Sequence, residues 1–212
     1  DGRVLVAGGW DSGNSITTSE VYEPQGGTWT PTGNLLTARN THAAVRLPNG
    51  RVLVSGGRDA TGAYLATAEL YDPATGLWTL TGPMAVPRQR HSLTLLLNGR
   101  VLAAGGRDSA NTGLASAELY DPASGLWTAT GAMTAARGFH SATLLPNGMV
   151  MVAGGWDSTT GTDLASVERY EPQSGMWFGS PPMAAIRDSH TATLMPDGRV
   201  LISGGSNTAA LP

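Results

Sequence analysis

One block of sequence recurs four times along the chain, and this repetition constrains the fold more than any other feature. Each block contains a glycine pair, a Tyr-acidic-Pro triplet, a Trp and an Arg-x-x-His motif, and a fifth glycine pair follows the last block. The markers advance by about 50 residues each time. Such a period indicates units that stack side by side, because one unit cannot bury its apolar face alone. The glycine pairs begin at Gly8, Gly56, Gly105, Gly154 and Gly204; the triplets begin at Tyr22, Tyr71, Tyr120 and Tyr170; the tryptophans are Trp29, Trp78, Trp127 and Trp177.

Four short strands are predicted within each block. In the third block they cover 91–96, 100–104, 115–120 and 126–129. Asn98-Gly99 between the first two strands is a strong hairpin signal. Asp121-Pro122 closes the third strand, because proline cannot donate to a ladder. No helical periodicity is sustained anywhere, so the sequence predicts an all-β chain with four antiparallel strands per block.

Composition excludes several classes of function. Charged residues make up 14% of the chain and the formal net charge is −3, so no basic surface for nucleic acid is predicted. Cysteine is absent, which excludes disulfides, thiolate metal sites and a cysteine nucleophile. The apolar runs, such as 93–97, are too short to span a bilayer. The chain starts within a block, so a leader could have been removed or could lie upstream.

The order of the glycine pair, Tyr and Trp resembles the kelch motif, and the resemblance covers essentially the whole chain. The segment LPNGRVLVSGG at 47–57 is similar to repeats of galactose oxidase-like propellers and of bacterial kelch proteins. The resemblance implies a β-propeller whose blades each have four antiparallel strands. Residues 1–212 are then one domain with a blade period of about 49 residues. Trp10-Asp11 and Trp156-Asp157 mimic the WD dipeptide, but they follow the glycines rather than closing a strand.

The predicted strands do not make a whole number of blades. The chain opens on the second strand of a blade, passes through three complete blades, and ends after two strands of another. That is about four blades plus an extra strand, so we expect a partial propeller, a fragment of a larger one. An open arc that closes by association, or an unusually small ring, is the alternative. Self-association is expected if the propeller does not close, because an open arc exposes sheet edges.

Residues that recur in every block are expected to serve the blade. The repeated Tyr and Trp should bury their rings between sheets. A Glu precedes each Tyr by two residues, and the Arg of the Arg-x-x-His motif recurs in equal number. We therefore predict one buried Arg–Glu pair per blade, with Arg88 reaching Glu69 or its counterpart in the adjoining blade. The histidines of the Arg-x-x-His motifs begin the innermost strands, where repetition favours a structural hydrogen bond over a central metal. The recurring charged and imidazole residues are Glu20, Glu69, Glu118 and Glu168, Arg39, Arg88, Arg137 and Arg187, and His42, His91, His140 and His190.

Two sets of residues vary from block to block and are therefore free to serve a ligand. One set lies between each Arg and His, and the other follows each glycine pair. In a four-stranded antiparallel blade both loops emerge on the same face, so the two sets should share one rim around the channel mouth. An Asp that recurs in the second set is expected to form an Asx turn. We predict that the rim binds a ligand or partner through Trp10, Arg58, Arg90, Arg107, Phe139 and Trp156.

These observations favour a non-catalytic binding and scaffolding module that presents its rim to a protein or a glycan. Known kelch modules bind partners on this face, so the resemblance agrees with the spacing. The alternative is a propeller fragment of a galactose oxidase-like copper-radical oxidase. That family's site needs a Cys-crosslinked Tyr and irregular His ligands, which this chain lacks. We therefore expect no catalytic residue, no metal and no cofactor here, no nucleic-acid partner and no membrane span. A bacterial, secreted or cell-surface protein is favoured, with the compartment left open.

Overall fold

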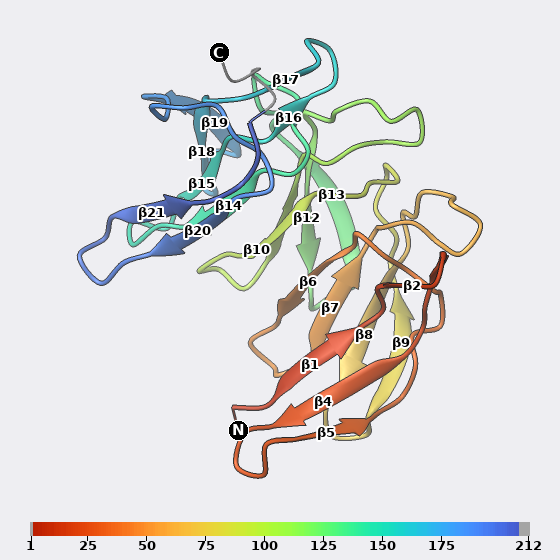
Figure 1. The fold of residues 1–212 in the computed structure, drawn as a ribbon. Helices are drawn as coiled ribbons and strands as arrows, with labels where there is room; N and C mark the ends of the chain where they lie inside the picture. Colours follow the sequence, from red (N-terminus) through yellow and green to blue (C-terminus); the bar gives the residue numbers. More distant parts are fainter. Residues whose placement is uncertain (1, 208–212) are drawn as a thin grey trace.

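The computed structural model describes residues 2–207, which form antiparallel β-sheets and contain no helix. Five sheets follow one another along an open arc (Figure 1), and we call them blades 1 to 5 in chain order. Blade 1 contains β1 (Val4–Ala7), β4 (Ser19–Glu23) and β5 (Thr28–Pro31); blade 2 contains β6 (Ala43–Arg46), β7 (Val52–Ser55), β8 (Ala68–Asp72) and β9 (Leu77–Thr81). Blade 3 contains β10 (Ser92–Leu95), β11 (Val101–Ala104), β12 (Ala117–Asp121) and β13 (Leu126–Thr130); blade 4 contains β14 (Ser141–Leu144), β15 (Val150–Ala153), β18 (Val167–Glu171) and β19 (Met176–Ser180); blade 5 contains β20 (Thr191–Leu194) and β21 (Val200–Ser203).

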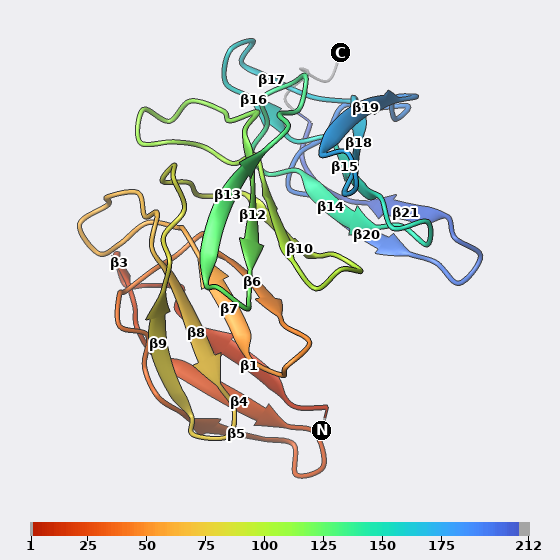
Figure 2. The ribbon, with the colours of Figure 1, turned by 180° about the vertical axis from the view of Figure 1, so that it is seen from behind.

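This arrangement confirms the predicted all-β fold and its blade composition. Three complete four-stranded blades lie between a three-stranded and a two-stranded one, and the strands of each blade pair in sequence order. The register is the same in each complete blade: Tyr120 of β12 lies opposite Val101 of β11 and Trp127 of β13. Seen from both sides, the sheets do not close into a ring (Figure 2).

Two short hairpins were missed by the sequence analysis. β2 (Trp10–Asp11) pairs with β3 (Asn14–Ser15), and β16 (Trp156–Asp157) pairs with β17 (Thr162–Asp163). Strands of two residues are too short to show an alternating pattern in the sequence. The expected Asx turn is present in the matching loops of blades 2 and 3. Asp59 Oδ1 accepts the backbone N–H of Thr61, and Asp108 Oδ1 accepts that of Ala110.

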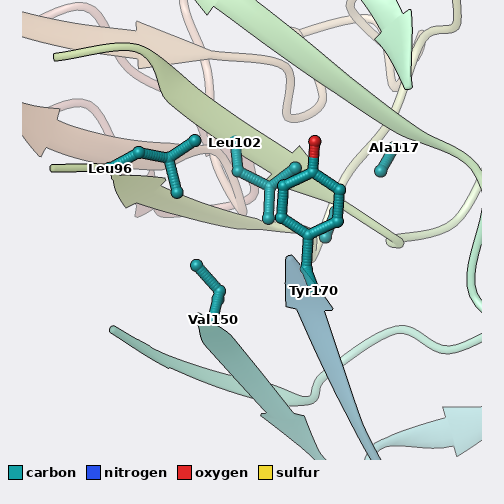
Figure 3. Packing of buried hydrophobic residues seen from close by; sticks show 6 residues of the cluster. Leu96, Leu102, Ala117, Val150 and Tyr170 are labelled. Carbon is teal, nitrogen blue, oxygen red and sulfur yellow. The ribbon is translucent and has the colours of Figure 1, made fainter. Parts of the chain in front are cut away.

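Apolar side chains pack between neighbouring blades. Figure 3 shows Leu96 and Leu102 of blade 3 beside Val150 and Tyr170 of blade 4. Tyr170 and Val150 are fully buried, and Leu96 and Leu102 are nearly so. Each blade therefore depends on its neighbour for its core, as expected for a repeat protein.

The expectation that the four repeated tryptophans are buried is correct for Trp78, whose side chain is 5% exposed, but wrong for Trp29, which is 50% exposed. Trp78 donates its indole N–H to the carbonyl of Gly33 in the loop that arrives from blade 1. Trp127 and Trp177 make the same bond to the preceding blade and are partly buried. Trp29 lies in blade 1 and receives no such loop in residues 2–207, so its ring stays open to solvent.

The predicted Arg–Glu pairs are present and buried in the three complete blades, but the prediction is wrong for Glu20 and Arg187, which form no such pair within residues 2–207. Arg39 reaches Glu69 at 2.7 Å, Arg88 reaches Glu118 at 2.8 Å, and Arg137 reaches Glu168 at 2.8 Å. Each Arg precedes the innermost strand of a blade, and its Glu lies on the third strand of that same blade. Each Arg therefore pairs with the Glu of the next repeat along the chain, not with the Glu that precedes it in its own repeat.

Candidate functional site at the channel mouth

The two variable sets of loops lie on one rim, as the blade geometry predicted. The residue that follows each repeated Arg forms an antiparallel bridge with the residue that follows the glycine pair of the same blade. In blade 2, Asn40 and Arg58 exchange both backbone hydrogen bonds, at 3.0 and 2.9 Å. In blade 3, Gln89 and Arg107 do the same. These bridges fix the position from which each variable side chain leaves the blade.

Four residues of the rim are joined by a backbone chain that runs from blade to blade. Arg90 donates its N–H to the carbonyl of Thr41, Phe139 donates to Arg90, and Ser189 donates to Phe139, at 2.9 to 3.1 Å. All four have a positive φ, between 51° and 59°. This left-handed conformation is unfavourable for residues with bulky side chains, and it persists only where the surrounding structure imposes it. The left-handed conformation recurs at the residue before every repeated histidine, so the fold imposes it. The identity of the side chain at this position differs from blade to blade.

Three guanidinium groups of the rim lie against aromatic rings. Arg90 lies 4.4 Å from the ring centroid of Phe139, and Arg107 lies 4.4 Å from that of Trp156 and 5.8 Å from that of Phe139. Arg58 lies 5.5 Å from Tyr64. These distances are in the range of cation–π attraction, which orients a cation without neutralising its charge.

The polar contacts of the three arginines include no salt bridge in the described part of the chain. Arg58 and Arg107 donate to the backbone carbonyls of Gly62 and Asn111, and none of the three forms an ion pair within the described part of the chain. Arg90 is an exposed residue, but partial desolvation of its guanidinium lowers the pKa of this group. The positive charge of Arg107 lowers the pKa further, and the Asp188 carboxylate acts in the opposite direction. The rim therefore presents three guanidinium groups that have no ion-pair partner in the described residues.

These side chains surround a hollow of about 750 Å³ at the channel mouth. It is lined by five of the six residues that the sequence analysis proposed for binding, and the sixth, Trp156, lies against Arg107. The five are Trp10, Arg58, Arg90, Arg107 and Phe139. Trp10 and Arg90 are exposed, while the others are partly buried.

The sequence analysis did not propose Tyr64, Gln89 and Asn111, which also line this hollow. Tyr64 Oη donates to Asn111 Oδ1 at 3.2 Å and accepts from Gln89 Nε2 at 2.9 Å. Tyr64 could have been singled out from the sequence, because it is the one tyrosine of the five that lies outside the repeated triplets and is therefore not required by the blade. Gln89 belongs to a variable set, but nothing in the sequence indicates its contact with a loop of the preceding blade.

The histidines beneath the rim make structural hydrogen bonds. Nε2 of His91, His140 and His190 pairs with the hydroxyls of Ser55, Ser92 and Ser141 respectively, at 2.8 to 3.0 Å. Burial lowers the pKa of His42 to about 4 and that of His140 to about 3, so both rings are neutral at physiological pH. Within residues 2–207, no cluster of three or more His, Asp or Glu side chains is placed to hold a metal ion. The same residues contain no helix long and apolar enough to cross a membrane.

Comparison with known proteins agrees with this architecture. A family model described as the KLHDC2/KLHL20/DRC7 Kelch-repeats domain matches residues 1–207. No curated protein matches the chain. Among solved structures, that titled "Structure of YjhT" superposes with a TM-score of 0.80 at 15% sequence identity, covering 99% of this chain and 76% of the other. At that identity the likeness shows the fold alone. The family match spans nearly the whole sequence, and the chain belongs to the kelch-repeat family of β-propeller proteins.

Proposed function

We propose that this chain binds an acidic segment of a partner protein at the rim of the channel mouth. Kelch domains generally mediate protein interactions, which supports a binding module as the broad function. The observation that carries the finer proposal is the set of three arginines around one hollow, each held by an aromatic ring and without a carboxylate partner among residues 2–207. Guanidinium groups bind carboxylates through paired hydrogen bonds, and Arg and aromatic residues are enriched at binding hot spots.

Peptide display provides a direct test. A random peptide library is panned against the wild-type chain, and the binders are compared with variants in which Asp and Glu are replaced by Asn and Gln. The neutralised peptides should bind the wild-type chain more weakly than the selected peptides do. The selected peptides should also bind more weakly to an Arg90→Ala, Arg107→Ala, Phe139→Ala triple variant of the chain. Arg100→Ala removes a cation from the opposite face and is the matched control. If the folded triple variant keeps full affinity, the binding site lies elsewhere, for example on the face around Asn98-Gly99.

A glycan is the second candidate ligand, because Trp10, Tyr64 and Phe139 provide aromatic surface on the same hollow. A glycan array probed with the wild type and the triple variant distinguishes it from a peptide ligand. The oxidase alternative has less support. The repeated histidines make hydrogen bonds to serine, and the chain has no cysteine for the cross-link of that family.

A further inference from the structure

The three arginines of the rim are held by contacts that leave most of their N–H donors available. Arg58 Nε donates to the carbonyl of Gly62 at 3.2 Å. Arg107 Nε and Nη2 donate to the carbonyl of Asn111 at 3.2 and 3.0 Å. The guanidinium of Arg90 lies over the ring of Phe139 and makes no hydrogen bond in the described residues. Because a guanidinium carries several N–H donors in a planar fork, a ligand in the hollow can accept hydrogen bonds from all three.

A hydrogen-bonded network fixes the ring beside Arg58. The guanidinium of Arg58 lies 5.5 Å from the ring centroid of Tyr64. Tyr64 Oη donates to Asn111 Oδ1 at 3.2 Å and accepts from Gln89 Nε2 at 2.9 Å. Gln89 Oε1 in turn accepts the hydroxyl of Thr41 at 2.9 Å. The ring is thus tied to loops of blades 2 and 3, so little conformational entropy is lost when Arg58 binds a ligand.

The positive charges of the three arginines lie close enough to act on one another. Arg90 and Arg107 lie 4.4 and 5.8 Å from the ring centroid of Phe139, so two cations share one ring. Partial desolvation lowers the pKa of Arg90, and the positive charges of Arg107 and Arg58 lower it further, while the carboxylate of Asp188 acts against them. A ligand with more than one negative charge relieves this repulsion better than a single carboxylate does.

The carboxylates that neighbour the rim arginines are engaged in their own loops. Asp59 Oδ1 accepts two backbone N–H groups of its loop, at 2.8 and 2.9 Å, and Asp108 Oδ1 accepts two of its own at 3.0 and 2.9 Å. Asp157 Oδ1 accepts one at 2.8 Å, and Asp188 accepts the hydroxyl of Ser206. These aspartates therefore shape the loops and form no salt bridge with the rim arginines.

The position of the arginines in the fold matches a compact anion. Arg58 belongs to blade 2, Arg90 and Arg107 belong to blade 3, and they line one hollow of about 750 Å³ inside the described arc. The chain has a formal net charge of −3, and a long polyanion would need a basic track that extends beyond one hollow. A phosphoryl group has three acceptor oxygens and nearly two negative charges at neutral pH, whereas a carboxylate has two oxygens and one charge. Guanidinium groups bind phosphate oxygens through paired hydrogen bonds.

We propose that the hollow binds a phosphorylated side chain of the partner protein, whose phosphoryl oxygens accept hydrogen bonds from Arg58, Arg90 and Arg107. This binding mode rests on the proposed function, the capture of an acidic segment at the rim. It makes the complex depend on a kinase that phosphorylates the partner, because the unmodified hydroxyl carries no charge to pair with the three arginines.

Synthetic peptide libraries test the proposal on the wild-type chain. The peptides are random at every position except the centre, which is phosphoserine, phosphotyrosine, glutamate or serine, and fluorescence polarisation measures their binding. At least one phosphorylated library should bind about tenfold or more tightly than the glutamate library, because the phosphoryl group adds a charge and further charge-assisted hydrogen bonds. The serine library should bind most weakly.

Substitution of the arginines should remove this preference. The triple variant Arg58→Gln, Arg90→Gln, Arg107→Gln should bind the phosphorylated and glutamate libraries equally weakly. Arg90→Gln alone is the second variant, because Arg90 is exposed and its guanidinium makes no hydrogen bond in the described residues, so its loss leaves the fold intact. It should lower the preference for the phosphorylated library by about fivefold or more.

The matched control removes three positive charges from the turns on the opposite face, where the side chains are exposed, through Arg51→Gln, Arg100→Gln and Arg199→Gln. The control should keep the full preference for the phosphorylated library. A preference that survives in the triple variant, or that falls equally in the control, overturns the proposal.

Inorganic phosphate and heparin identify the other sources of the same negative charge. Inorganic phosphate that binds as tightly as the phosphorylated libraries would show that the hollow takes a free anion. Heparin that binds more tightly than these libraries, and through the same arginines, would show that the ligand is an extended polyanion. Either result overturns the proposal.

The libraries also separate this proposal from the broader function. Equal binding of the glutamate and phosphorylated libraries overturns phosphoryl recognition and leaves the capture of an acidic segment intact. Binding of the glutamate and phosphorylated libraries that is no tighter than binding of the serine library overturns both.

Discussion

Glu118 holds two different partners, one with each oxygen of its carboxylate. Oε1 accepts a hydrogen bond from Arg88 Nη2 at 2.8 Å, and Oε2 accepts one from the backbone N–H of Ala85, also at 2.8 Å. One carboxylate thus neutralises a buried guanidinium and holds the loop that joins blade 2 to blade 3. The same arrangement recurs in blades 2 and 4, so each complete blade holds the loop that enters it through one buried ion pair.

Removing the negative charge of Glu118 should destabilise the whole domain. Glu118→Gln leaves Arg88 charged and buried without a counterion, which we expect to lower the free energy of unfolding by about 3–5 kcal/mol. Denaturant unfolding followed by circular dichroism measures this. Asp72→Asn, at the exposed Arg51–Asp72 pair, is the control and should leave the unfolding midpoint unchanged. A midpoint for Glu118→Gln equal to that of the control would refute the structural role of the pair.

The tryptophans should differ in their contribution to stability according to whether a neighbouring blade covers them. Trp78→Ala removes a ring that is 5% exposed, so a loss of about 3–5 kcal/mol is expected. Trp10, on the rim, is 62% exposed, and Trp10→Ala should change stability by less than about 0.5 kcal/mol. Thermal unfolding of the two variants makes the comparison, and equal losses of melting temperature would contradict the assignment.

Phe139→Gly should separate binding from stability. Phe139 has a φ of 59°, a conformation that glycine adopts freely, so the substitution relieves backbone strain while it removes the ring. We expect the free energy of unfolding to change by less than about 1 kcal/mol, because the unfolded chain also gains entropy from glycine. The ring contacts of Arg90 and Arg107 are lost, and affinity for an acidic peptide selected by panning should fall. Destabilisation as large as that of Trp78→Ala would show that the ring is part of the core.

The buried histidines should make the domain sensitive to acid. Burial lowers the pKa of His42 to about 4 and that of His140 to about 3, against 6.5 for an ordinary histidine. The unfolded chain therefore binds more protons below pH 6.5, so stability falls as pH decreases from 6.5 towards 3. Melting temperatures measured across this range should decline, and His140→Gln should show a shallower decline. A decline of the same slope in His140→Gln would place the acid sensitivity elsewhere.

The sequence by itself determined the blade as a unit. Glycine pairs, turns such as Asn98-Gly99 and the closing Asp121-Pro122 act over a few residues, so their effect on strand boundaries needs no knowledge of the rest of the chain. Repetition also separated residues that serve the blade from those that vary. The shared rim followed from the alternating direction of antiparallel strands, which is why Arg58, Arg90 and Phe139 could be placed together in advance.

Only the tertiary structure decided which repeated groups meet. The sequence left Glu69 and its counterpart in the adjoining blade as alternatives for Arg88, and the choice of Glu118 depends on how the linking loop docks onto the next sheet. The repeated motif likewise did not determine whether its Trp ring is buried. Trp29 and Trp78 occupy the same place in their repeats, yet only Trp78 receives a loop from a preceding blade, because burial depends on neighbours that the local sequence does not specify.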